Sequence, residues 1–322
     1  MRTYVLRRLL QLVPLLLGVS ALTFLLLQLA PGDFLATMAE NPQISAEALE
    51  QMRRNFGLDR PWYIQYVLYV RNIFLHLDFG QSFSYHQPVF AVLRHGLANT
   101  LLLAGAAAAV TWGLAVPLGV IAAVRQHTWV DRGLSVAAVV WLSIPEVLSG
   151  LVLLFLAART GWLPVGGMHD IDYESMSPVG RVVDVLRHLA LPALVVGLVP
   201  LASRMRQMRA NLLDVLRLDF VTTARAKGLG EGAVVGRHAV RNALNPLITL
   251  FGFTLGSLLS GSFVAETIFN WPGLGTLTLE AIQRQDPYLV MGAALMASTV
   301  LVLGNLVADL LLAVADPRIR HD

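Results

Sequence analysis

The chain has 322 residues; 56% of them are hydrophobic, 14% are charged, and the formal net charge is +3 at pH 7. Soluble domains are commonly about one quarter charged, so this composition is typical of an integral membrane protein, and we expect no nucleic-acid partner. Because the sequence has no cysteine, it excludes disulfides, thiolate nucleophiles and cysteine-ligated metals.

The N-terminal part is expected to contain one membrane span followed by a long polar segment. Residues 9–30 carry no charge, and this run is long enough to cross a hydrocarbon core of about 30 Å. It also exceeds the roughly 7–15 apolar residues of a signal peptide, which favours an uncleaved anchor. Residues 31–96 are too polar for a span, but Pro61 predicts the start of an amphipathic helix that could lie on the membrane or against the bundle.

Five more spans are expected in the remainder of the chain. They cover residues 97–124, 134–158, 188–202, 247–269 and 289–315. We therefore predict an all-α integral membrane protein with six transmembrane helices, a long extracytoplasmic segment after the first, and a cytoplasmic loop between the fourth and fifth. Its expected parts are an arm and first helix at residues 1–30, the extracytoplasmic segment at 31–96, and a five-helix core at 97–322 with its loop at 203–245.

The distribution of basic residues predicts the orientation of these spans. Of the 24 lysines and arginines, 15 fall in segments expected to lie inside and 9 in segments expected to lie outside. Cytoplasmic loops carry an excess of such residues, so both termini are expected in the cytoplasm.

The longest polar, basic stretch of the C-terminal half covers residues 218–246. Asp214 could start a helix to residue 227, where Gly228 is placed to end it and turn the chain. A second short helix is expected to reach about residue 245, since Pro246 blocks regular continuation. Small and basic side chains suit a docking surface for a partner, although a solvated basic loop held inside by its charge explains the pattern equally.

This stretch resembles the coupling loop of the permeases of ATP-binding-cassette importers, in its dipeptide and oligopeptide form. The resemblance rests on VTTARAKGLG at residues 221–230 and RHAVRNALNP at 237–246. The family motif is Glu-Ala-Ala, three residues, then Gly: Gly228 matches the glycine and Ala224 the second alanine. Thr222 and Thr223 replace Glu and the first Ala, so no role that requires the glutamate is carried over.

Four further stretches extend the resemblance over the whole chain. They are YVLRRLLQLVPLLLGVSALTFLLLQLAPGD, NFGLDRPWYIQY, WPGLGTLTLEAI and DLLLAVADPRIR. The resemblance implies the first (B-type) of two related permeases in the inner membrane of a prokaryote. It also implies two cytoplasmic ATPases that bind ATP and Mg, an extracytoplasmic substrate-binding protein and a peptide substrate, with membrane lipid around the spans and no cofactor in this chain.

The resemblance also assigns roles to particular residues. Contact with the ATPases is expected from Asp219, Thr222, Thr223, Ala224, Arg225, Ala226, Lys227 and Gly228. The outer mouth, near the docked binding protein, is expected at Glu266, Trp271, Pro272, Gly273 and Gly275, with Trp271 suited to the membrane interface and the proline and glycines forming a turn. That loop could equally be an ordinary interfacial turn.

Glu146 is the charged residue expected deepest in a span, beside Pro145. A carboxylate at the bilayer centre is costly, so it should face protein or water. It could receive the amino terminus or a basic side chain of a passing peptide. It could equally hydrogen-bond backbone groups freed by Pro145.

Several other functions are disfavoured by the motifs. Lys227 lies in no phosphate-binding loop, and the sequence has no metalloprotease or serine-hydrolase signature, so we expect a transport subunit and not an enzyme. A secondary transporter would need ion-coupling carboxylates in its spans, and only Glu146 is central. His76, His86 and His95 match no recognised ligand spacing, so no metal site is expected. Import of nickel or another small solute is the remaining alternative to peptide import.

Overall fold

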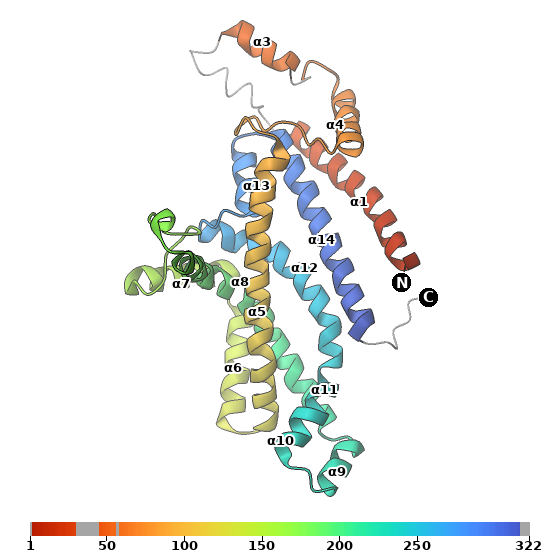
Figure 1. The fold of residues 1–322 in the computed structure, drawn as a ribbon, viewed down its shortest axis with the longest axis vertical. Coiled ribbons are helices and arrows are strands. Elements are labelled where there is room, and N and C mark those ends of the chain that lie inside the picture. The colour runs from red at the N-terminus through yellow and green to blue at the C-terminus, as the bar shows by residue number, and fades with distance from the viewer. Residues whose placement is uncertain (1, 30–44, 56–57, 316–322) are drawn as a thin grey trace. The chain divides into compact units, whose positions relative to one another are not determined.

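The computed structural model describes residues 2–29, 45–55 and 58–315, and the residues so described form helices and no strand. The helices are α1 (Arg2–Leu29), α3 (Ala46–Asn55), α4 (Trp62–His76), α5 (Val89–Val124), α6 (Trp129–Ser143), α7 (Glu146–Thr160), α8 (Pro178–Val215), α9 (Asp219–Ala226), α10 (Glu231–Ala233), α11 (Val240–Ala243), α12 (Asn245–Ile268), α13 (Leu274–Gln283) and α14 (Pro287–Ala315) (Figure 1). Residues 31–44 of the expected extracytoplasmic segment and the expected tail from residue 316 lie outside the described residues.

The long apolar runs form long helices, which confirms the all-α membrane fold. Four stretches among the described residues are long and apolar enough to span a membrane. They are Leu10–Leu29, Val89–Val124, Pro178–Val215 and Pro287–Val307. The total of six spans and their orientation stay predictions. As expected, a helix, α4, follows Pro61, which is its N-cap; its amphipathic character stays a prediction.

The third expected span is not one straight helix, contrary to the sequence prediction. It is divided into α6 and α7, which bend by 107° at the break. Pro145 explains the break, because proline disfavours a helical conformation at the preceding residue, and Ile144 is extended with φ −90° and ψ 125°. Glu146 therefore begins α7 and does not lie at the centre of a continuous span.

The fourth expected span is too short in the sequence prediction. The helix α8 has 38 residues and begins already at Pro178. Ser177 caps this start by accepting a hydrogen bond from the Gly180 N–H, and proline is favoured at the first position of a helix. At its other end α8 includes Asp214, so Asp214 does not start the next helix.

The chain divides into two compact units. One holds residues 1–99 and 273–302. Its apolar core joins α5, α13 and α14 through Val89, Leu93, Ala281 and Leu289. A polar contact lies beside this core: Asp286 is fully buried and accepts hydrogen bonds from Ser82 Oγ at 2.6 Å and from the Ser84 N–H at 3.0 Å.

The other unit holds residues 100–272 and 303–322, and α8 is its central helix, with α6, α7 and α12 packed against it (Figure 1). The C-terminal part of α5 approaches α8 closely at two glycines. A Cβ on Gly119 would lie 2.7 Å from the backbone oxygen of Met205, and a Cβ on Gly197 would lie 3.0 Å from the backbone oxygen of Ala107. Only glycine permits both approaches without a shift of backbone.

Candidate functional site

The connection between α8 and α12, residues 216–244, forms a small helical body at the end of α8 (Figure 1). Its first helix, α9, ends as the sequence predicts. Gly228 has φ +77°, a left-handed conformation that favours glycine, and its N–H donates to the Arg225 carbonyl at 2.9 Å. A Cβ built on Gly228 would meet no other atom within 4 Å, so the glycine is required by the backbone conformation and not by crowding.

The second helix of this connection is less regular than expected. A short α10 continues into a π-helical segment, Val234–Ala239, and then into α11. Pro246 lies in the first turn of α12, where a missing N–H breaks no helical hydrogen bond. The proline therefore begins the next helix almost at once after Ala243.

One face of the connection is buried against α5, α8 and α12. Val221 and Ala224 from α9 pack with Val234, Ala239 and Ala243 against Met208 and Leu212 of α8. The amide Nδ2 of Asn211 on α8 also donates to the carbonyl of Ala243 at 3.2 Å. Ala224 is only 7% exposed, so it belongs to this base and not to the outer face on which the sequence analysis placed it beside Gly228.

The opposite face is exposed and mixes apolar and charged side chains. Exposed residues here include Asp219, Thr222, Thr223, Arg225, Ala226, Lys227 and Gly228. Leu218, Phe220 and Leu229 are also exposed, at 49%, 40% and 42%. The sequence analysis missed these three, although apolar residues inside a basic stretch were a usable signal. Aromatic and arginine side chains together are typical of protein docking surfaces.

Arg225 is held in place by Glu231, a partner that sequence reasoning did not identify. The guanidinium donates to both carboxylate oxygens, with Nη2–Oε1 at 2.6 Å and Nε–Oε2 at 3.1 Å. This hydrogen bonding lowers the pKa of Glu231 and raises the pKa of Arg225. Because the pair is exposed, we expect it to orient Arg225 more than to stabilise the fold.

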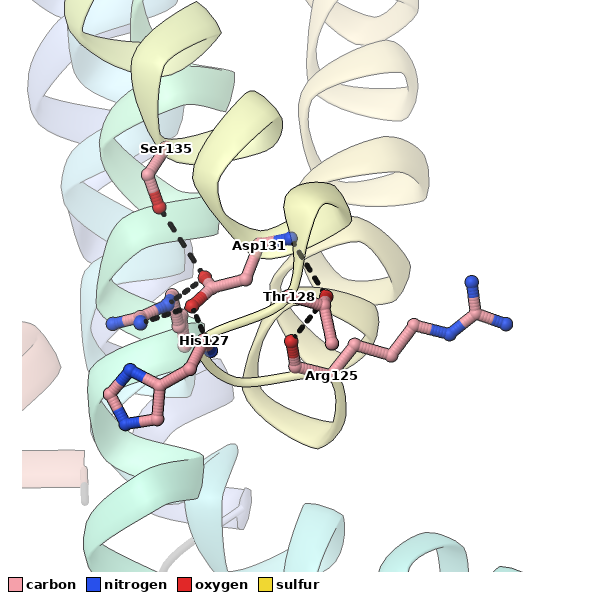
Figure 2. A network of polar contacts seen from close by, with 6 residues as sticks. Arg125, His127, Thr128, Asp131 and Ser135 are labelled. Carbon is pink, nitrogen blue, oxygen red and sulfur yellow. Dashed lines mark hydrogen bonds and ion pairs between the residues drawn. The ribbon is translucent and has the colours of Figure 1, made fainter.

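A second polar network joins α6 to α8, and its centre is Asp131, which is 4% exposed. Arg209 of α8 donates to both carboxylate oxygens, from Nε at 2.6 Å and from Nη2 at 2.8 Å. Figure 2 shows Asp131 with residues of the α5–α6 turn and of α6: the His127 N–H of the turn donates to Asp131 at 3.0 Å, and Ser135 Oγ of α6 donates at 3.5 Å. Thr128 caps α6 by accepting from the Asp131 N–H. The Thr-x-x-Asp spacing was the available sign of a helix start here.

Glu146 lies in the first turn of α7, directly after the bend. Its Oε1 atom is buried and has no hydrogen-bond partner within the described part of the chain. The expected alternative, a bond from this oxygen to backbone groups freed by Pro145, is therefore not observed for Oε1. Ser149 Oγ donates instead to the backbone carbonyl of Glu146 at 2.8 Å.

The residues expected at the outer mouth are mostly buried. Glu266 is fully buried and accepts a hydrogen bond from Thr100 Oγ1 at 2.6 Å. Trp271 is also fully buried, packed with Leu103 and Leu189, so it is not the interfacial side chain that the sequence suggested. Of the predicted turn, Pro272 is exposed, Gly273 is the N-cap of α13 and Gly275 lies inside that helix.

Asp170, Asp184 and His188 bring three possible metal-ligand atoms within 4.8 Å of one another. It is the only such group among the described residues, which do not bring His76, His86 and His95 together. The polar atoms contact each other: the Asp170 N–H donates to Asp184 Oδ2 at 2.9 Å, and His188 Nδ1 lies 2.9 Å from the Asp184 carbonyl. We therefore assign the group to holding the preceding loop on α8.

Two family models match the chain. Residues 115–321 match the inner membrane component of binding-protein-dependent transport systems, and residues 1–104 match the N-terminal part of such components. A solved structure of the MetNI methionine ABC transporter, in inward-facing conformations, aligns with a TM-score of 0.55 at 20% identity, over 70% of this chain and 97% of that chain. This likeness supports the fold.

Curated relatives match from end to end. An oligopeptide transport system permease protein, AppB of Bacillus subtilis, is 38% identical over 100% of both chains. The di/tripeptide permease protein DppB of Pseudomonas aeruginosa is 39% identical and the dipeptide permease protein DppB of Escherichia coli 36%, each over 100% of this chain and 99% of the relative. The expectation of a transport subunit that is not an enzyme is confirmed by this family. The chain belongs to the inner membrane components of binding-protein-dependent transport systems, the permease subunits of ATP-binding-cassette importers.

Proposed function

We propose that this chain is the first (B-type) permease subunit of an importer for dipeptides and oligopeptides. Relatives that match it over their full length at 36–39% identity are named as peptide permeases. The proposed complex contains a second related permease, two cytoplasmic ATPases that bind ATP and Mg, and an extracytoplasmic substrate-binding protein. Both termini and the α8–α12 connection would then lie in the cytoplasm, as the distribution of basic residues indicates.

The observation that carries this proposal is the two-sided build of the α8–α12 connection. Its inner face is anchored on α8 by apolar packing and by the Asn211–Ala243 hydrogen bond, while its outer face exposes Phe220, Arg225 and Lys227. Because its inner face is packed against α8 and hydrogen-bonded to it, we expect the connection to move together with α8 when a partner displaces the outer face. Closure of the ATPases on ATP would move it and rock the attached helices as a rigid body.

Glu146 is our candidate for contact with the substrate. An unpaired, buried carboxylate oxygen in the first turn after a sharp bend is costly unless a partner arrives. We infer that the cationic amino terminus or a basic side chain of a passing peptide supplies that partner.

At the proposed outer mouth, the buried Glu266 and Trp271 would position the loop, while the exposed Pro272 would be available to the binding protein. Gly273 and Gly275 then act at the start of α13, where they shape the chain that follows.

The test is reconstitution of the complete complex in proteoliposomes. We expect uptake of labelled di- and oligopeptides that requires ATP and the binding protein. Uptake by this chain alone, driven by an ion gradient, would show a secondary transporter. ATP-dependent uptake of nickel without uptake of any peptide would favour the small-solute alternative.

A further inference from the structure

Within little more than one turn of α8, side chains contact two different parts of the chain: the α8–α12 connection and α6. Met208 and Leu212, four residues apart and both fully buried, face the base of the α8–α12 connection. Arg209 lies between them in sequence and reaches Asp131 on α6. Residues one position apart point to different sides of a helix, so this segment of α8 holds the connection on one side and α6 on another.

The contact with α6 has a fixed geometry. A planar guanidinium that meets both carboxylate oxygens constrains direction as well as distance, which a single ammonium contact does not. The carboxylate is held from its own side too, by the His127 N–H and by Ser135 Oγ (Figure 2). Arg209 therefore contacts a buried and fully oriented acceptor at the start of α6, and not a flexible surface acid.

The helix so held leads directly to the candidate pathway. After its last residue, Ser143, the chain bends by 107° and enters α7 with Glu146 in the first turn. One regular helix thus joins the residues near Asp131 to the bend.

We propose that Arg209 and Asp131 are a positioning pair that transmits movement of the α8–α12 connection to the α6–α7 bend during transport. This inference rests on the proposed function, since it assumes that the connection is what the ATPases move. The pair contacts neither nucleotide nor substrate. Its loss should separate ATP hydrolysis from transport and leave both partners able to bind.

A purely structural pair would behave differently. Leaving one member of a buried ion pair without its partner destabilises a protein, and that effect would lower assembly, ATP hydrolysis and uptake together. The readout that separates the two roles is the number of peptides transported per ATP hydrolysed, which a uniform loss of folded complex does not change.

The experiment compares Arg209→Gln, Asp131→Asn and the double variant with Arg206→Gln, in the complete complex in proteoliposomes. Arg206 is exposed and lies one turn earlier on α8. Arg206→Gln removes the same positive charge as Arg209→Gln, so it is a matched control. We expect normal co-purification of the ATPases in each variant. We expect peptides transported per ATP to fall at least about fivefold in Arg209→Gln and Asp131→Asn, but not in Arg206→Gln.

The double variant should be no worse than either single one, because the two residues act through one contact. If Arg209→Gln does not accumulate in the membrane, Arg209→Lys keeps the charge, loses the two-pronged contact and carries the same test. A transport ratio equal to that of Arg206→Gln overturns the proposal, and so does a loss of ATPase co-purification in parallel with uptake. Failure of the wild-type complex to import peptide would instead overturn the proposed function.

Discussion

Ala224 and Gly228 lie four residues apart but face different surroundings. The methyl group of Ala224 lies within the buried apolar base of the connection, whereas a Cβ on Gly228 would meet no atom within 4 Å. Both match small residues of the family motif, yet the physical reasons differ. Ala224 is buried in the apolar base of the connection, whereas Gly228 has a φ of +77°, which disfavours any side chain.

The first prediction concerns Gly228. Gly228→Ala should cost on the order of 1 kcal/mol through backbone strain alone and leave ATPase docking largely intact. Gly228→Asp adds a negative charge to a surface that exposes Arg225 and Lys227, so co-purification of the ATPases and substrate-stimulated ATP hydrolysis should both fall. Wild-type levels of both in Gly228→Asp would mean that this surface is an ordinary basic loop.

The second prediction separates the two faces of α9 with one substitution type. Ala224→Asp places a carboxylate in the apolar base and should destabilise the connection by on the order of 3 kcal/mol. Ala226→Asp, at an exposed position of the same helix, should change stability by no more than about 0.5 kcal/mol while still weakening docking. Thermal unfolding of the purified permease pair measures the difference. Equal unfolding temperatures would contradict the buried position of Ala224.

The third prediction concerns which exposed side chain dominates docking. Phe220→Ala should weaken ATPase binding by about 2 kcal/mol, roughly thirtyfold, because truncation of a central aromatic anchor has effects of this size. Arg225→Ala should weaken binding much less than Phe220→Ala, since the pairing of Arg225 with Glu231 is exposed to solvent. Titration of the permease pair in nanodiscs with ATPase subunits gives both affinities. A larger effect at Arg225 than at Phe220 would reverse this ranking.

The fourth prediction concerns Glu146. Glu146→Gln keeps the shape and removes the charge, so we expect normal assembly with lower uptake of some peptides, above all those with a basic side chain. A panel of labelled peptides that differ in charge and length provides the measurement. Glu174→Gln, which removes an exposed carboxylate, is the control. Identical uptake across the panel in the two variants would exclude Glu146 from the pathway.

The fifth prediction concerns orientation. The chain has no cysteine, so a single introduced cysteine reports one position. We expect an impermeant maleimide to label exposed Gln51→Cys and Glu174→Cys in intact cells, and Gly230→Cys only after permeabilisation. Labelling of Gly230→Cys in intact cells would invert the topology.

The parts of the fold that the sequence predicted well are those encoded by local chemistry. Long uncharged runs define helices, Gly228 defines a left-handed turn, and Pro246 defines a helix start. The length and hydrophobicity of an apolar run do not reveal whether the helix bends within it, however. The run that contains Pro145 looks like one span, and the bend of 107° becomes visible only when α6 and α7 are both packed against α8.

The candidate site also has features that a local motif predicts and features that only tertiary packing reveals. A motif names Ala224 and Gly228 together, but only tertiary packing reveals that Ala224 is buried. Trp271 was misplaced for the same reason, because an indole suits a membrane interface and a core equally well until its neighbours are known. Asp131 and Arg209 are 78 residues apart, and no local pattern pairs them.

The close approaches of α5 and α8 have a mechanical consequence. Met205 meets α5 at Gly119, and Gly197 meets it at Ala107; at 1.5 Å per residue these two places are about 18 Å apart along α5. A single close contact would permit α8 to pivot against α5, but two separated close contacts oppose both pivoting and sliding of the two helices. We expect α8 and the C-terminal part of α5 to move as one rigid body through the transport cycle. The conformational change should then be concentrated at bends such as the one before Glu146.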